Sequence, residues 1–374
     1  MKILIMKFRH FGDVLLTSPM ASALATLPDK PQVTFLVKQG TEVMLTGHPD
    51  IHEILTLPVR ARGESQWQFT RRQFAFIRAL RAQRFDVSIN TTEGDRGLIF
   101  GWLSGAAKRV GYLKDASREK WWRKRLLTDP KPSRSGRFHT VLRNLDLITD
   151  WVTPTNMRVS FHYTPLDEQV VFDKLKQAGW DGNQPLVHVH AVSRWFFKCW
   201  RDDYMAQTID HIQQTLGYRV VLTSAPDPQE LGKLAGIIAL CQTQPINLGG
   251  QLSLKQTGAL SALAKLFFGV DSAPMHMAAA VDTPTVAIFG PSGAFDWGPW
   301  PNGWEDMAVN PYSERNGIQR VGQHIVAQQT WDCAPCGRDG CNGSKQSKCL
   351  EDLLSRLVLS LIQQTINVPS GNVS

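Results

Sequence analysis

The sequence predicts an α/β protein with two domains, each built on a parallel β-sheet. Apolar segments of strand length alternate with segments whose apolar residues recur at helical spacing, and this alternation starts twice along the chain. The length of 374 residues also favours two domains, because a single domain usually holds roughly 100–200 residues.

The first half opens with an apolar strand, a glycine turn and a helix, which together are the first unit of a doubly wound sheet. The strand covers residues 2–7, the turn is Gly12-Asp13, and the helix covers residues 14–24. The elements expected after this unit are a strand at 33–37, a helix at 66–84, a strand at 85–90 and a helix at 138–151.

The second half repeats the pattern, with Thr164-Pro165-Leu166 as the expected hinge. We therefore expect domains at 1–166 and 167–374. The expected strands are 186–189, 218–223, 246–248, 266–270 and 285–289, and the expected helices are 203–216, 229–241, 275–281 and 352–366.

The charge is divided unevenly between the two halves. Residues 1–166 hold 26 basic and 14 acidic side chains, a net charge of +12, whereas the remainder holds 15 basic and 19 acidic, a net charge of −4. This indicates an anionic partner for the first half. The overall composition, 43% hydrophobic and 20% charged, excludes a mainly disordered chain.

The sequence favours a cytoplasmic location. No segment approaches the roughly 18 continuous apolar residues that span a bilayer, and the first residues do not form a signal peptide. Six cysteines in a chain of this length do not indicate a disulfide-built secreted scaffold.

Asp13 follows the first strand, where doubly wound sheets place their ligands. Its carboxylate can accept a proton from a hydroxyl group, or it can cap the helix that begins beside it. The surrounding sequence lacks the G-x-G-x-x-G fingerprint of a dinucleotide site, which argues against a nucleotide-sugar epimerase or dehydrogenase.

Two further segments carry polar residues at strand ends. Asp271 ends a buried strand, and Ser272 then begins a helix whose free amides attract anions; His276 lies one turn inside and is either a ligand or a packing residue. Lys198 lies among aromatic residues, where a charged side chain is unusual. Either its ammonium binds a diphosphate, or its aliphatic stem covers the aromatic rings at the surface.

A basic, tryptophan-containing segment occupies residues 118–125. Its cations are Arg118, Lys120, Arg123, Lys124 and Arg125. The combination fits a membrane interface, an anionic glycolipid or single-stranded nucleic acid, and the alternative is a solvated helix face.

Four cysteines near the C-terminus form a C-x2-C-x4-C-x7-C pattern: Cys333, Cys336, Cys341 and Cys349. They are either ligands of a structural zinc ion or loop thiols that stay reduced or form pairs. His188 and His190, which alternate on a strand, are expected to be packing residues.

Three segments in this order resemble the ADP-heptose:lipopolysaccharide heptosyltransferases (glycosyltransferase family 9): residues 11–19 (FGDVLLTSP), 197–200 (FKCW) and 269–276 (GVDSAPMH). The last two look most like the branch of lipopolysaccharide core heptosyltransferase III. The resemblance implies the GT-B arrangement, two facing Rossmann-like domains. It also implies an inverting transfer of L-glycero-D-manno-heptose from ADP-heptose to the lipopolysaccharide inner core, with the third heptose added to the second.

The resemblance also assigns roles to residues. It makes Asp13 the general base and places the donor against Lys198, Ser272, Asp271, His276 and Ser193. Ala273 stands where family members often have glycine, and Asp227 or Glu230 is the acidic residue expected near the nucleoside. The basic segment 118–125 would bind the acceptor. No metal and no cofactor are expected, because lysine and helix amides supply the positive charge.

The expected partners are therefore ADP-heptose and the lipopolysaccharide acceptor, with no nucleic acid, and the expected location is the cytoplasmic face of the inner membrane. Two alternatives stay open. One is a different core heptose transfer, of the heptosyltransferase I or II type. The other is a nucleotide-dependent anion-binding protein that uses the basic segment for nucleic acid.

Overall fold

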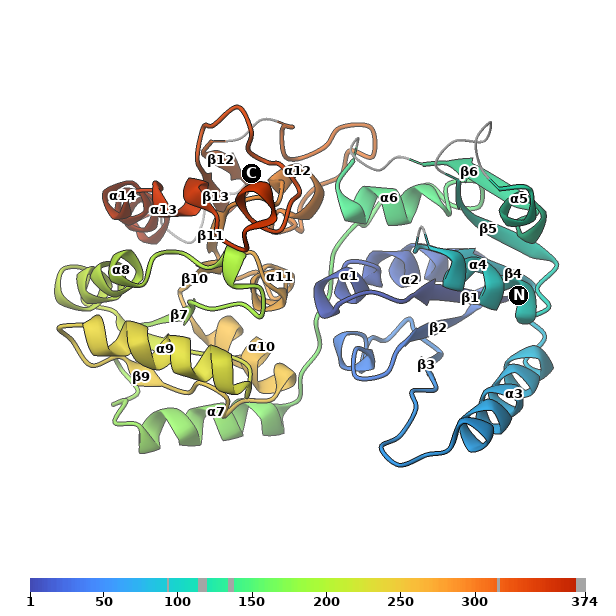
Figure 1. Ribbon diagram of the computed structural model, residues 1–374, viewed down its shortest axis with the longest axis horizontal. Coiled ribbons are helices and arrows are strands. Elements are labelled where there is room, and N and C mark those ends of the chain that lie inside the picture. The colour runs from blue at the N-terminus through green and yellow to red at the C-terminus, as the bar shows by residue number, and fades with distance from the viewer. Residues whose placement is uncertain (93, 114–119, 134–137, 315–316, 368–374) are drawn as a thin grey trace. The chain divides into compact units, whose positions relative to one another are not determined.

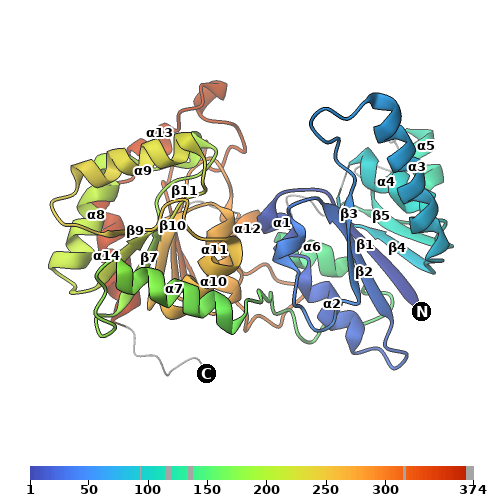
Figure 2. The same cartoon turned by 90° about the horizontal axis from the view of Figure 1, so that it is seen from below.

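The computed structural model describes residues 1–92, 94–113, 120–133, 138–314 and 317–367. The chain divides into two compact units, Met1–Ser160 and Phe161–Ser374. Each unit is a mainly parallel sheet covered by helices on both faces, as Figures 1 and 2 show. The predicted α/β class with two parallel-sheet domains is therefore observed.

The first unit contains a six-stranded sheet in the order β3-β2-β1-β4-β5-β6, with every pair parallel. Its strands are β1 (Lys2–Lys7), β2 (Gln32–Lys38), β3 (Glu53–Leu57), β4 (Val87–Asn90), β5 (Lys108–Leu113) and β6 (Asp129–Pro132). Its helices are α1 (Phe11–Leu15), α2 (Ser18–Ala25), η1 (Glu42–Met44), α3 (Gln66–Ala82), α4 (Asp95–Leu103), α5 (Trp121–Leu126) and α6 (Thr140–Asp146).

The second unit contains a seven-stranded sheet in the order β12-β13-β11-β10-β7-β8-β9, in which only β12 is antiparallel. Its strands are β7 (Leu186–His190), β8 (Arg219–Leu222), β9 (Ile246–Asn247), β10 (Leu266–Val270), β11 (Thr285–Phe289), β12 (Gln319–Val321) and β13 (His324–Gln328). Its helices are α7 (Pro165–Gln177), η2 (Phe196–Lys198), α8 (Asp202–Gln214), α9 (Pro228–Leu240), α10 (Leu254–Leu263), α11 (Ala273–Ala280), α12 (Ala294–Trp297), η3 (Cys341–Gly343), α13 (Lys348–Glu351) and α14 (Ser355–Ile366).

The main core of the second unit lies between the sheet and the layer of α8, α9 and α14. Val187, Val220, Phe268 and Ile288 come from four neighbouring strands and are fully buried there, together with Leu361 of α14. The central strands β7, β10 and β11 are buried along their whole length because both of their faces are covered, as is usual for parallel sheets, and β10 and β11 are almost wholly apolar. The C-terminal helix is thus part of this core.

The second unit begins before the expected hinge. Phe161 packs against Gly258 of α10 so closely that a Cβ there would lie 2.3 Å from the Phe161 ring. Lys255, on the same helix, donates a hydrogen bond to the carbonyl of His162. The expected boundary after residue 166 therefore falls inside α7, whose first turn is fixed by the reciprocal capping of Thr164 and Asp167.

The expected helix at residues 14–24 is two helices. α1 ends after Leu15, and α2 begins at Ser18 with Pro19 in its first turn, where proline lacks the N–H that a continuous helix would need. A residue of α6 stabilises the corner between α1 and α2, because the side-chain amide of Asn144 donates a hydrogen bond to the carbonyl of Leu16. Among the described residues, no helix is long and apolar enough to cross a membrane.

His188 and His190 lie on one face of β7 and are buried, as expected of packing residues. Both rings hydrogen-bond to Thr223 Oγ1, at 2.7 and 2.9 Å, and His188 also bonds to Ser261 Oγ at 2.8 Å. Burial lowers the pKa of His190 to about 4 and that of His188 well below its ordinary value, the latter also because of the neighbouring His190. These histidines are neutral in the folded state.

We expect the free energy of unfolding to fall as the pH is lowered from about 6.5 to about 4. The unfolded chain takes up protons on these histidines near their ordinary pKa of about 6.5, whereas the folded chain takes one up at His190 only near pH 4. Urea unfolding at a series of pH values measures the slope. His190→Gln should make it shallower, and His52→Gln, at an exposed position, should not change it. An unchanged slope in His190→Gln would contradict this account.

Candidate functional site

The strand order of the second unit reverses between β7 and β10. From β7 the sheet continues through β8 and β9 on one side, and from β10 it continues through β11 and β13 on the other. Ligands of open parallel sheets bind outside the carboxyl ends of the strands at such a point. The loop after β7 carries Ser193 and Lys198, and the loop after β10 carries Asp271 and Ser272. The chain thus brings together candidates about 80 residues apart in sequence.

The two strands approach closely at this point. Gly269 of β10 pairs with His190 of β7, and a Cβ at Gly269 would lie 2.6 Å from the carbonyl oxygen of His190. Since no side chain fits there, glycine is required. The loops that leave the ends of these two strands therefore start side by side.

A buried ion pair joins the two loops. Lys198 Nζ lies 2.6 Å from Asp271 Oδ2; the lysine side chain is 24% exposed and the aspartate side chain 8%. Burial by itself raises the pKa of Asp271, but the charge and hydrogen bond of Lys198, a hydrogen bond from Ser292 and the charge of His276 together bring it below its ordinary value. An ammonium has three N–H donors, so the bond to Asp271 aims Lys198 without using its full capacity.

The N-terminus of α11 begins at the same place. Ser272 is its N-cap and Ala273 its first residue. Ser272 Oγ is buried and has no hydrogen-bond partner within the described part of the chain, and His276 is buried one turn further along. The positive end of a helix dipole and an unsatisfied buried hydroxyl group, next to a lysine ammonium, favour an anionic ligand.

The remaining donor-side candidates differ in position. Asp227 is exposed and caps α9 by accepting the backbone N–H groups of Gln229 and Glu230. Glu230 is buried, and its carboxylate accepts the backbone N–H of Ala225 in the loop after β8. Burial raises the pKa of Glu230. Of the two, Glu230 is the carboxylate held inside the loop at the sheet edge.

Ser193 is buried and shapes the loop that carries Lys198. Its hydroxyl accepts the backbone N–H of Trp195 at 3.3 Å, and its carbonyl accepts the thiol of Cys199 at 3.7 Å. Burial raises the pKa of Cys199 to about 11, so this thiol stays protonated. The two contacts close the loop into a turn ending in η2.

The cysteine-rich segment, residues 331–350, binds the loops around the ion pair. Ser347 Oγ donates a hydrogen bond of 2.6 Å to the carbonyl of Phe197, the residue before Lys198. The N–H of Gly337 donates to the carbonyl of Pro291 at 2.8 Å, and Pro335 packs against Gly293. This segment therefore braces the loops after β7 and β11, a role that no local sequence signal indicated.

The four cysteines of this segment are free thiols. Burial, and then the charges of Cys341, Cys336 and Cys333, raise the pKa of Cys349 to about 11. Across the residues that the structure describes, no group of three or more His, Cys, Asp or Glu side chains is arranged to hold a metal ion. The segment thus contributes packing and hydrogen bonds as it stands.

Asp13 occupies the corresponding place in the first unit, whose strand order reverses between β1 and β4. It lies in α1, half-buried, and its Oδ2 accepts the backbone N–H of His10 at 3.3 Å. The carboxylate therefore caps the helix in part, and it also lies at the carboxyl edge of the sheet, where open parallel sheets bind their ligands.

Residues 121–125 of the basic segment lie in α5. Arg118 lies outside the described residues. Lys120 is the N-cap of α5, and Lys124 and Arg125 are exposed. Arg123 instead pairs with Asp95 of α4 at 2.9 Å, and its side chain is only 12% exposed, so it anchors α5 to α4.

Comparison with known proteins decides the family. A family model described as glycosyltransferase family 9 (heptosyltransferase) matches residues 73–320, well over half of the chain. The chain belongs to glycosyltransferase family 9. It is a transferase of the heptosyltransferase family, as its sequence predicted. Lipopolysaccharide heptosyltransferase 3 of Escherichia coli is 31% identical to it over 308 residues, which cover 82% of this chain and 88% of the relative.

Solved structures agree in fold. A glycosyl transferase family 9 structure from Veillonella parvula matches with a TM-score of 0.78 and 18% identity, covering 98% of this chain and 97% of its own. ADP-heptose lipopolysaccharide heptosyltransferase II of Escherichia coli matches with a TM-score of 0.71 and 18% identity, covering 98% of each chain. The predicted GT-B class, with two Rossmann-like domains, is confirmed for this family 9 member.

We expect Lys198→Met to lower the free energy of unfolding at pH 7 by about 2–4 kcal/mol, because it leaves the buried Asp271 carboxylate without its cation. The double variant Lys198→Met/Asp271→Asn should lose less of the free energy of unfolding than Lys198→Met alone, because the double variant no longer buries an unpaired charge. Urea unfolding of the three proteins measures these differences.

Lys345→Met is the matched control for this substitution. Lys345 pairs with Asp339 at the surface, where both side chains are more than half exposed, so its loss should cost at most about 0.5 kcal/mol. Equal, small losses for Lys198→Met and Lys345→Met would show that the buried pair does not constrain the loops.

Proposed function

We propose that this chain transfers L-glycero-D-manno-heptose from ADP-heptose to the inner core of lipopolysaccharide, adding the third heptose to the second. The observation that carries the proposal is the meeting of Lys198, Asp271 and the start of α11 at the switch point of the second sheet. Family membership and the 31% identity to lipopolysaccharide heptosyltransferase 3 of Escherichia coli support this acceptor.

The second unit is the donor-binding domain in this proposal. The diphosphate of ADP-heptose lies against the Lys198 ammonium and the N-terminus of α11, which stabilise the negative charge that develops as ADP leaves. Asp271 holds the ammonium in place through its 2.6 Å contact. The hydroxyl of Ser272, buried and unsatisfied among the described residues, gains its hydrogen bond from the ligand.

The remaining donor contacts follow the same edge of the sheet. Ser193 and Ala273 shape the loops on either side of the diphosphate, and His276 orients the sugar and phosphates together with Asp271. The nucleoside lies near the loop after β8, where Asp227 caps α9 and the carboxylate of Glu230, in the first turn of α9, bonds to the loop.

The first unit supplies the base. An acceptor hydroxyl oxygen attacks the anomeric carbon of the heptose, and the bond from that carbon to the diphosphate oxygen breaks with inversion. The bonding electrons leave with ADP, and the proton of the hydroxyl group passes to the carboxylate of Asp13. Its position in α1, at the carboxyl edge of the first sheet, fits a group that meets substrate.

The proposed acceptor is an anionic glycolipid, and the first unit has the net positive charge to match. Lys120, Lys124 and Arg125 present exposed cations on α5, and Arg123 holds that helix on α4. Arg118 belongs to the same acceptor-binding segment in this proposal. The enzyme works at the cytoplasmic face of the inner membrane, peripherally associated with it.

Mass spectrometry of the product tests the proposal. With ADP-heptose and a core lipopolysaccharide that ends at the second heptose, the protein should add the mass of one heptose. Addition only to a core that lacks the first or second heptose would assign it to an earlier transfer. No addition to any core acceptor, with RNA bound in a salt-dependent way, would favour an anion-binding protein.

We expect Asp13→Asn to lower the turnover number by about 10²–10⁴-fold, because an amide cannot take the proton of the acceptor hydroxyl. The affinity for ADP should stay within about twofold of the parent, since the diphosphate contacts belong to the other unit. Steady-state kinetics and calorimetry measure the two quantities.

Asp29→Asn is the control for the Asp13 variant. Asp29 is an exposed carboxylate of the same unit, so its loss should leave both turnover and ADP affinity unchanged. Transfer by Asp13→Asn at the parent rate would remove Asp13 from the role of base.

A further inference from the structure

Helix α3 has an exposed aromatic face in addition to its packed face. Phe76 and Ile77 face the protein and Leu80 is buried against it. On the opposite side Trp67 is 70% exposed and Phe74 is 64% exposed. Burial in the unit's own core therefore does not account for these two large aromatic side chains.

Arginine residues lie between the aromatic side chains on this exposed face. Trp67, Arg71, Phe74 and Arg78 follow one another at intervals of four, three and four residues, which places them in one stripe along the helix. All four are exposed, and the Arg71 guanidinium lies 5.8 Å from the centre of the Trp67 ring. We call these four residues the α3 stripe.

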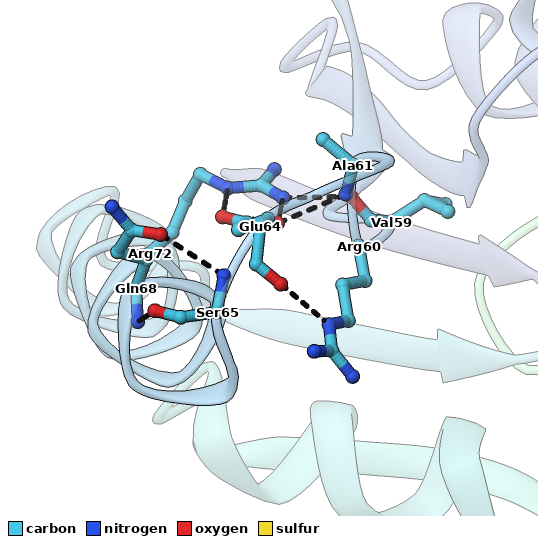
Figure 3. Close-up of polar contacts among 7 residues, drawn as sticks. All are labelled: Val59, Arg60, Ala61, Glu64, Ser65, Gln68 and Arg72. Atoms are coloured by element: carbon cyan, nitrogen blue, oxygen red, sulfur yellow. Dashed lines mark hydrogen bonds and ion pairs between the residues drawn. The ribbon is translucent and has the colours of Figure 1, made fainter.

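The charge of α3 has one sign. The helix contains four arginines and no acidic residue. The carboxylate just before it, Glu64, is paired with Arg72 at 2.8 Å (Figure 3). The hydrogen bond from Arg72 is the largest of the influences that lower the pKa of Glu64, so this acid is ionised and its charge is matched. The arginines of the α3 stripe are not paired with it.

The start of α3 is also well fixed. Ser65 and Gln68 cap the first turn reciprocally, and Arg72 reaches back to the carbonyl of Val59, as Figure 3 shows. Arg60 donates a further hydrogen bond to the carbonyl of Glu64. The stripe therefore projects from a helix whose entry is held by the preceding loop.

The neighbouring helices extend this surface. α3, α4 and α5 lie next to one another on one face of the first sheet in both views (Figures 1 and 2). Ile99 and Trp102 of α4 are 41% and 52% exposed, and Trp121 of α5 is 75% exposed. The large exposed apolar side chains of this helical layer are thus accompanied by arginine and lysine.

A cavity beneath α3 also combines apolar side chains with cations. It measures about 310 Å³, and its walls include Leu57, Phe69 and Phe76. Two cations, Lys38 and Arg96, also line it. Apolar walls with cations beside them suit an amphiphile with an anionic headgroup.

We propose that the α3 stripe, with the exposed residues of α4, docks the enzyme on an anionic lipid bilayer. Arginines alternating with aromatic residues on a helix without acids match anionic headgroups above apolar chains, and tryptophan and phenylalanine occupy the boundary between them. A protein partner would need acidic side chains placed among apolar ones to match the stripe. An anionic bilayer presents negatively charged headgroups and apolar chains over its whole surface. The inference deepens the proposed function and rests on it for the membrane location of the acceptor.

Sedimentation of the full chain with vesicles tests the proposal. The vesicles are phosphatidylcholine, with or without about a third phosphatidylglycerol. The parent should bind the anionic vesicles, and binding should weaken as salt is raised. W67E/F74E should lower the partition coefficient about tenfold, and R71S/R78S should lower it comparably on anionic vesicles only.

The control is L166E/L240E. These leucines lie in the second unit and are also highly exposed, at 72% and 54%, so the variant adds the same charges without touching α3. It should bind like the parent. Transfer of heptose to a water-soluble, deacylated core acceptor by W67E/F74E should proceed at the parent rate, which also shows that the variant is folded.

Three results would overturn the proposal. The parent could fail to bind anionic vesicles while transferring heptose to the soluble acceptor, or W67E/F74E could bind them as tightly as the parent. As a third contradicting result, W67E/F74E could convert a dimer of the protein to a monomer in analytical ultracentrifugation without changing vesicle binding. The α3 stripe would then be a dimer interface. Vesicle binding as expected with no transfer to any acceptor would instead reject the proposed function alone.

Discussion

The contact between Lys198 and Asp271 is the constraint around which the second unit is organised. A carboxylate that is 8% exposed is stable only when its charge is matched, so the loops after β7 and β10 must hold these two groups 2.6 Å apart. Gly269 lets the two strands approach, Ser193 and Cys199 close the first loop, and α11 begins directly after Asp271. The position of the Lys198 ammonium is thereby set by contacts within the chain itself.

Segments distant in sequence maintain this arrangement. The cysteine-rich segment follows the last strand, yet Ser347 bonds to the carbonyl next to Lys198 and Gly337 bonds to the loop after β11. α14 then closes the core against the sheet. Preorganised charge costs little reorganisation during a reaction, which is how a lysine and a helix terminus stabilise a leaving diphosphate. The first unit shares the arrangement of its central strands with the second, so Asp13 and Lys198, the proposed base and the proposed phosphate ligand, follow equivalent strands of the two sheets.

The sequence predicted the parts of the fold that depend on local pattern, since alternating elements predicted two parallel sheets. Polar residues after apolar strands predicted Asp13, Lys198 and Asp271 as candidate site residues, and the structure places Lys198 and Asp271 in contact. The sequence does contain a signal for the start of α7, because Thr164 and Asp167 form a capping pair. A helix therefore begins where a hinge was expected. Other features have no local signal. The bond from Ser347 to Phe197 joins residues 150 positions apart, and the exposure of Trp67 depends on which side of α3 meets the sheet.

In the proposed donor site, Lys198 is the cation that meets the diphosphate. Isothermal titration of ADP into the parent and into Lys198→Ala tests this directly, with Lys265→Ala as a surface control, because Lys265 is exposed and directly precedes β10 at the opposite edge of the sheet. We expect the dissociation constant of Lys198→Ala to rise about tenfold or more, since a charge-assisted hydrogen bond to phosphate is lost, and that of Lys265→Ala to stay unchanged. Parent-like affinity in Lys198→Ala would contradict the account, because the buried pair would then hold the loops without serving the ligand.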